Sequence, residues 1–216
     1  MNAKYNFFKI ILENLGVEIK DERVYDLCNA VCMNFVEFTG EPTEPPSSCV
    51  VALASNSGAS FPNAAAAGLN CISDKHLLIQ EIGDFIEENY RDSATEVYYS
   101  NYGEIFPGFG HPSIKGEDSR VRFLIDEFND LAGERTRFLL NLEGLLSSKS
   151  RPVKMNIGGA ISCLLLDAGI PKEYVLYFPL IGRLFGWLKI FNATKNNFSN
   201  VKPSQELLKA LSAHEH

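Results

Sequence analysis

Apolar residues recur at helical spacing along most of the chain. In residues 76–90, for example, Leu78, Ile82 and Ile86 are spaced so that one face of a helix is buried and the other is polar. Strict alternation of apolar and polar residues, which is typical of half-buried strands, is almost absent. The pattern predicts an all-α fold with helices over residues 1–17, 22–38, 76–90, 119–130, 135–146, 157–168, 173–191 and 204–213.

Two segments rich in proline interrupt this helical pattern. Residues 41–48 (EPTEPPSS) predict a loop, because proline fixes φ and has no N–H to donate. Residues 106–112 (FPGFGHP) predict a second loop. Between the two loops, residues 50–68 are mostly small, which suits helices whose backbones approach each other closely.

The most hydrophobic segments do not have the pattern of export or membrane signals. Charged residues interrupt the apolar residues of segment 1–17, which therefore predicts an amphipathic helix. Segment 174–191 contains Pro179, Arg183 and Lys189, and these residues favour a buried helix over a bilayer span. We therefore expect a cytoplasmic protein with no membrane partner.

Composition narrows the possible classes of protein. The 216 residues suffice for one domain or two small lobes, and 45% hydrophobic with 22% charged residues is ordinary globular usage. The formal net charge of −7 argues against a nucleic-acid partner, because polyanion binding depends on clustered Lys and Arg. The five cysteines include no CxxC pair, which argues against a disulfide framework and against a metal site. Cys28 and Cys32, one helical turn apart, are predicted to be small core residues.

Candidate chemistry centres on the second loop. Two of the four histidines lie in the last three residues, which leaves His76 and His111. His111 follows glycines that let backbone N–H groups approach a ligand, and Lys115 and Arg120 lie shortly after it. A histidine in such a loop can donate to a carbonyl oxygen while the cations hold carboxylate or phosphate. The alternative is an ordinary loop histidine among solvated charges.

Arg183 is a second candidate, because it lies in the middle of an apolar helix. A buried charge without a partner is costly, so this arginine needs either a structural ion pair with an acid or an anionic ligand. The sequence leaves both possibilities open.

These residues carry a resemblance to a known family. The block Gly108-Phe109-Gly110-His111, Lys115 and Asp118-Ser119-Arg120 resembles the GxGHxxxK..DPR signature of the citrate synthase family. Arg183 in GRLFGW is similar to the ARTVGW helix of that family, and Gly169-Ile170-Pro171 precedes it at a similar distance. Upstream, residues 57–68 are similar to the STGAD…AAIAAG stretch, which in the family leads to a catalytic histidine and here leads to His76. The resemblance extends from about residue 47 to residue 189.

The resemblance implies an all-α, two-lobed homodimer that joins or cleaves a carbon–carbon bond between a coenzyme A thioester and a keto acid, without a metal. His111 would polarise the keto carbonyl, and His76 would hydrogen-bond the thioester enol oxygen. Residues 1–76 and 158–216 would form the larger lobe, and residues 77–157 the smaller lobe with the glycine loop. The resemblance further assigns substrate binding to Arg120, Arg183 and Asn156, and contact with coenzyme A to Gly108, Phe109, Gly110 and Lys115.

Three positions depart from the family pattern. Gly158 stands where the family has the aspartate base of its NVD motif, and glycine cannot remove an α-proton. Leu77 and Leu78 follow His76 where the family has two glycines. Beyond the matching region, a late arginine of the family falls near Lys202-Pro203, where a lysine keeps the charge and loses the bidentate fork.

Two classes of function remain open at this stage. An enzyme would act on another acyl thioester, either with a replacement carboxylate from Glu117, Asp118 or Asp167, or on a malonyl-type donor whose extra carboxylate uses the space vacated at Gly158. Loss of carbon dioxide generates the carbanion of such a donor without a base. Alternatively, the chain is a catalytically degenerate homologue that binds an acyl-CoA or a tricarboxylate as a sensor or as the partner of an active subunit.

Overall fold

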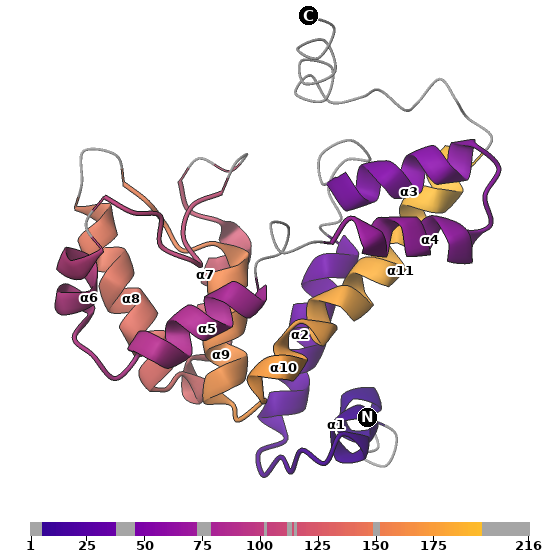
Figure 1. Ribbon diagram of the computed structural model, residues 1–216. Helices are drawn as coiled ribbons and strands as arrows, with labels where there is room; N and C mark the ends of the chain where they lie inside the picture. Colours follow the sequence, from indigo (N-terminus) through magenta and orange to yellow (C-terminus); the bar gives the residue numbers. More distant parts are fainter. Residues whose placement is uncertain are drawn as a thin grey trace, which may run out of the picture. The chain divides into compact units, whose positions relative to one another are not determined.

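The chain folds into helices, as the computed structural model in Figure 1 shows. The structure describes residues 6–37, 46–72, 79–101, 103–111, 114, 116–148 and 152–195. Among these residues there is no strand, and the only extended pairing is an isolated antiparallel bridge between Phe109 and Met155. The predicted all-α class is therefore confirmed.

The chain divides into two compact units, each of which we describe by itself. One comprises Met1–Val31 with Leu77–Pro179, and the other comprises Cys32–His76 with Leu180–His216. Residues 1–31 and 158–179 thus belong to the same unit as the glycine loop. The lobes inferred from the resemblance instead group these two segments with residues 32–76. That lobe division stays a prediction.

In the first unit, α9 is the central helix. This helix is apolar on every side, and all of its residues from Ile157 to Leu166 are buried. It contacts α5, α7, α8 and α10. The unit contains α1 (Phe7–Asn14), α5 (Ile79–Asn89), α6 (Ala94–Ser100), α7 (Ser119–Glu127), the 3-10 turn η2 (Asn129–Leu131), α8 (Glu134–Ser147), α9 (Ile157–Asp167) and α10 (Lys172–Val175), together with the first part of α2 (Arg23–Glu37) and the first residues of α11 (Tyr177–Thr194).

Small residues hold the second unit together. The unit contains α3 (Pro46–Asn56), α4 (Phe61–Asn70) and most of α11 (Tyr177–Thr194), together with the last part of α2 (Arg23–Glu37). A Cβ on Gly68 of α4 would lie 2.6 Å from Val51 and 3.0 Å from Trp187, so only glycine allows this approach. The indole of the fully buried Trp187 donates to the Ser48 hydroxyl over 3.2 Å. The small-residue run therefore packs closely, as predicted.

Most of the predicted helices within the described residues are confirmed, with two differences. The predicted loop over residues 41–48 is wrong at its end, because α3 begins at Pro46. Proline is tolerated there, since the first helical N–H has no intrahelical partner. Helix α6 was not predicted; its local signal is Ser93, whose hydroxyl accepts from the Thr95 N–H at the N-terminus. The predicted helix over 204–213 lies outside the described residues.

The described cysteines are free, and four of the five are buried. Cys28 and Cys32 lie in the core as predicted, and burial raises the pKa of Cys28 to about 12. The segment Lys172–Thr194 is long and apolar enough to span a membrane, and half of its most apolar window is buried inside the protein. Buried core helices meet the same criterion, so this segment gives no more than weak evidence for a membrane.

Candidate functional site

The glycine loop is fixed to the segment that precedes α9. Gly110 donates its N–H to the Lys154 carbonyl over 2.8 Å, and Asn156 donates its N–H to the Gly108 carbonyl over 2.9 Å. Between these two hydrogen bonds lies the bridge of Phe109 and Met155. The Met155 N–H in turn donates to the Glu143 carboxylate of α8 over 2.9 Å. The loop is therefore part of the rigid core of its unit.

Two glycines make this close approach possible. A Cβ on Gly159 would lie 2.6 Å from the Gly108 carbonyl oxygen, and a Cβ on Gly108 would lie 3.2 Å from the Gly159 Cα. Gly108 also has a φ of 87°, in the left-handed region that other residues avoid. The close approach of the two backbones therefore explains the glycine at residue 108 of the GFG sequence, whether or not the loop binds a ligand.

His111 follows this fixed loop and is exposed. Its Nδ1 accepts the Ile114 N–H over 3.0 Å. An imidazole nitrogen that accepts is unprotonated in the neutral ring, so Nε2 carries the hydrogen. His111 therefore presents an N–H donor of the kind that polarises a carbonyl oxygen.

Arg120 lies nearby in sequence and is held by Asp118. Its Nε donates to Asp118 Oδ1 over 2.9 Å, and its Nη2 donates to Oδ2 over 2.6 Å. The same carboxylate caps the N-terminus of α7 by accepting the Arg120 backbone N–H over 3.0 Å. Burial raises the pKa of Asp118, but Arg120 and His111 more than offset burial, so that the pKa lies below its usual value.

This lowered pKa predicts a pH-dependent contribution to stability. Since the carboxylate is favoured in the folded state, the contribution is present above the ordinary aspartate pKa and is lost as the pH falls through the folded value. Asp118→Asn should lower the free energy of unfolding at neutral pH by about 1–2 kcal/mol, and the gap to wild type should shrink below about pH 4. Denaturant unfolding of both proteins between neutral and acid pH measures this. A gap that stayed constant with pH would contradict the assignment.

Both polar atoms of the Asn156 side chain form hydrogen bonds within the protein. Its Oδ1 accepts the Gly159 N–H over 3.0 Å and so caps α9, and its Nδ2 donates to the Gly110 carbonyl over 2.9 Å. The structure thus gives this predicted substrate-binding residue a place in the support of the loop; contact with a substrate stays a prediction.

Gly158, which the resemblance aligns with the aspartate of the NVD motif, lies in the first turn of α9 and is buried. A Cβ there would lie 2.9 Å from Ile82 Cδ1 and 3.5 Å from Ile79 Cδ1. The space beside Gly158 is therefore occupied by the side chains of α5, whereas the sequence led us to expect room for a substrate carboxylate. In this conformation such a carboxylate would require Ile82 to move.

Gly158→Asp should therefore fail to restore proton transfer. The new side chain meets Ile82 and Asn156, and overpacking of this kind costs about 1–3 kcal/mol of stability. We expect a lower melting temperature and no gain in condensation rate. Gly144→Asp is the control, because a Cβ on Gly144 meets nothing within 4 Å. A Gly158→Asp protein as stable as this control, and more active than wild type, would contradict the account.

The three candidate replacement carboxylates are all engaged elsewhere. Asp118 is held by Arg120, as described above. Asp167 is buried and accepts three backbone N–H groups at the start of α8. Glu117 is exposed and lies 3.5 Å from the Arg122 guanidinium. None of the three therefore has the geometry of a base that is aimed into a substrate site.

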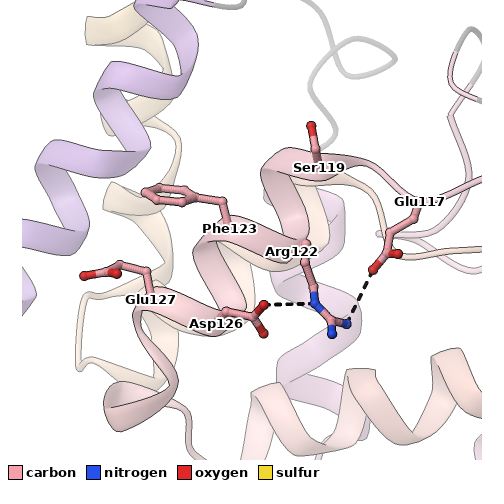
Figure 2. A pocket seen from close by; sticks show the side chains of 6 residues that line it. All are labelled: Glu117, Ser119, Arg122, Phe123, Asp126 and Glu127. Atoms are coloured by element: carbon pink, nitrogen blue, oxygen red, sulfur yellow. Dashed lines mark hydrogen bonds and ion pairs between the residues drawn. The ribbon is translucent and has the colours of Figure 1, made fainter.

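Glu117 also borders a shallow groove of about 540 Å³ along α7, which Figure 2 shows. Its lining residues are Glu117, Ser119, Arg122, Phe123, Asp126 and Glu127. In the groove, Arg122 lies between Glu117 and Asp126, with its Nε donating to Asp126 over 2.9 Å. Apart from the candidate base Glu117, none of the predicted site residues that the structure describes lines this groove.

The remaining predicted site residues lie either outside the described residues or in the other unit. His76 and Lys115 lie outside the described residues. Arg183 is in the other unit, on α11, where its side chain is buried and its guanidinium carbon lies 5.1 Å from the Phe35 ring centroid. Within the described residues, no group of three or more His, Cys, Asp or Glu side chains is placed to hold a metal ion.

Comparison with known proteins identifies the family. A family model described as the C-terminal domain of citrate synthase matches residues 40–203, which is most of the chain. The chain belongs to the citrate synthase family. The resemblance of the glycine loop and of the Arg183 helix is thereby confirmed at the level of the family. No curated protein sequence matches this citrate synthase-family chain.

Several solved structures share the fold. Citryl-CoA lyase from Hydrogenobacter thermophilus is 22% identical with a TM-score of 0.80, covering 93% of this chain and 80% of the lyase. ATP citrate lyase from Methanothrix soehngenii, solved with citrate and coenzyme A, is 19% identical with a TM-score of 0.67, covering 85% of this chain. Citrate synthase from the archaeon Thermoplasma acidophilum, solved with carboxymethyl coenzyme A and oxaloacetate, is 16% identical with a TM-score of 0.69, covering 88% of this chain. At these identities the likeness shows the fold alone, and the chain spans 35% of that ATP citrate lyase and 53% of that citrate synthase.

Proposed function

We propose that this protein makes or breaks a carbon–carbon bond between an acyl-CoA, or another acyl thioester, and a keto acid, without a proton-transfer group at residue 158. The substrates are proposed from the family, whose solved members include proteins bound to citrate, oxaloacetate and coenzyme A derivatives. A cytoplasmic location and a homodimer are proposed on the same basis.

One observation carries the proposal: the orientation of His111. Its Nδ1 accepts the Ile114 N–H, so in the neutral ring Nε2 carries the hydrogen and is the donor atom. A donor on a rigid loop stabilises the negative charge that develops on a keto oxygen, and loss of one such donor typically costs about 10²–10³ in rate. Geometry thus supports a role of His111 at the keto carbonyl, whereas it supports no proton transfer at residue 158.

The test is turnover in both directions. The full-length protein is incubated with citryl-CoA, with acetyl-CoA plus oxaloacetate, and with malonyl-CoA plus oxaloacetate, and the products are quantified by mass spectrometry. We expect citryl-CoA cleavage or the malonyl-CoA reaction to proceed, the latter with release of carbon dioxide, whereas condensation of acetyl-CoA would need the base that residue 158 lacks. Solvent deuterium entering acetyl-CoA would contradict the claim that no base replaces the missing aspartate.

The second candidate is a binding protein that senses or sequesters an acyl-CoA or a tricarboxylate, or serves as the partner of an active subunit. Gly158 and the three engaged carboxylates favour it, because none of these four positions offers a group aimed at the α-proton. This candidate predicts saturable thioester binding, no turnover with any of the donors, and an effect of His111→Ala on affinity alone.

A further inference from the structure

Asn156 lies at the junction between the core of its unit and the loop that carries His111. Its backbone N–H and its side-chain Nδ2 donate to the carbonyls of Gly108 and Gly110, each over 2.9 Å. Its Oδ1 and its carbonyl oxygen accept the N–H groups of Gly159 and Ala160 in the first turn of α9. One residue therefore binds the loop on one side and the buried central helix on the other.

The bond from Nδ2 bears directly on His111. The Gly110 carbonyl belongs to the peptide group that joins Gly110 to His111, and a peptide group is planar. Gly110 has a φ of 77°, and a glycine at such a φ has wide conformational freedom. A hydrogen bond to the Gly110 carbonyl therefore fixes the orientation of the Gly110–His111 peptide plane. The direction in which the His111 backbone continues depends on that plane.

We propose that Asn156 is a positioning residue, whose side-chain amide orients the Gly110–His111 peptide so that the His111 ring meets the keto oxygen. This inference rests on the proposed function for the role of His111, and it gives the Asn156 amide a task other than substrate contact. The same side chain caps α9, so two variants are needed to separate orientation of the loop from stability of the helix.

Asn156→Ser and Asn156→Asp make this separation. Serine and aspartate both cap helices as well as asparagine does, so either retains an acceptor for the Gly159 N–H. Serine is too short to reach the Gly110 carbonyl, and aspartate places a second oxygen against it. Both variants should remain folded. In Asn156→Ser the glycine loop loses its hydrogen bond to residue 156, and in Asn156→Asp the new carboxylate oxygen repels the Gly110 carbonyl. Ser93→Ala is the control, because it removes a side-chain cap of another helix, α6, in the same unit.

The first readout is the ¹⁵N NMR spectrum of the His111 side chain in the full-length protein at about pH 8, where an ordinary imidazole is neutral. His111→Gln assigns the signals. We expect wild type and Ser93→Ala to show unprotonated Nδ1 and protonated Nε2, and both Asn156 variants to shift toward the averaged values of an unconstrained ring. Unchanged His111 signals in both Asn156 variants would overturn the proposal.

The second readout is turnover. Asn156→Ser should lower kcat about tenfold or more and leave the KM for the acyl thioester within about twofold, because the change affects the orientation of a donor. Ser93→Ala should leave both parameters unchanged, and equal losses in the two variants would overturn the proposal. The NMR measurement requires no substrate, so an inactive wild-type protein would contradict the proposed function while the orientation test still stands.

Discussion

Asp167→Ala is expected to lower the free energy of unfolding by about 3–5 kcal/mol. The carboxylate is buried at the start of α8, where it accepts the N–H groups of Gly133, Arg135 and Thr136 over 2.7, 3.1 and 2.9 Å. These N–H groups have no intrahelical partner, and the helix dipole favours a negative charge beside them. Alanine would leave these donors without their acceptor and would remove the more distant of two carboxylates beside the Arg135 guanidinium, at 3.6 Å, while Glu87 stays at 2.6 Å.

The measurement is denaturant unfolding of the purified protein. A loss of this size should lower the melting temperature by about 2–4 °C per kcal/mol for a chain of this length. Asp126→Ala is the matched control: Asp126 is exposed and pairs with Arg122 over 2.9 Å, and it should change stability by no more than about 0.5 kcal/mol. If Asp167→Ala were as stable as this control and had lost turnover, Asp167 would be the replacement base, and its structural assignment here would be wrong.

His111→Ala is expected to lower kcat by about 10²–10³, with little change in stability. The ring is exposed and accepts the Ile114 N–H, so its removal takes no side chain out of the core. The acyl thioester should still bind, because the loss concerns stabilisation of charge on the keto oxygen.

His111→Gln provides the matched comparison. Glutamine places an N–H donor on a side chain of similar reach and should recover part of the lost rate. Equal activity of wild type and His111→Ala would contradict the role of this residue. A change in affinity without any turnover in wild type would favour the binding protein.

The sequence predicts the class of fold and the family well, because both depend on patterns that are local in the chain. Helical spacing marks α2, α5, α8, α9 and α11 closely, and the GFGH…DSR block is unusual enough to indicate its family. Helix α6 was not predicted because it is short and has few apolar residues, Val97 and Tyr98 among them. These are too few to show a helical period. Capping by Ser93 was the only other signal.

The candidate site is harder to predict, because the roles of its residues depend on contacts between distant parts of the chain. Nothing near Gly158 in sequence indicates that Ile79 and Ile82 fill the space beside it. Similarly, the sequence around Asp167 does not show that its carboxylate binds the N–H groups at the start of α8, more than thirty residues away in sequence. Glu143, which fixes the Met155 N–H, gave no signal at all in the sequence.

Calorimetric titration of the full-length protein tests the central claim most directly. Coenzyme A, acetyl-CoA and malonyl-CoA are each titrated with and without oxaloacetate or citrate. The account predicts saturable binding of a thioester that strengthens when the carboxylate is present, because both ligands occupy one site around His111. No binding of any thioester, with or without a carboxylate, would contradict it and would leave the family likeness as a likeness of fold.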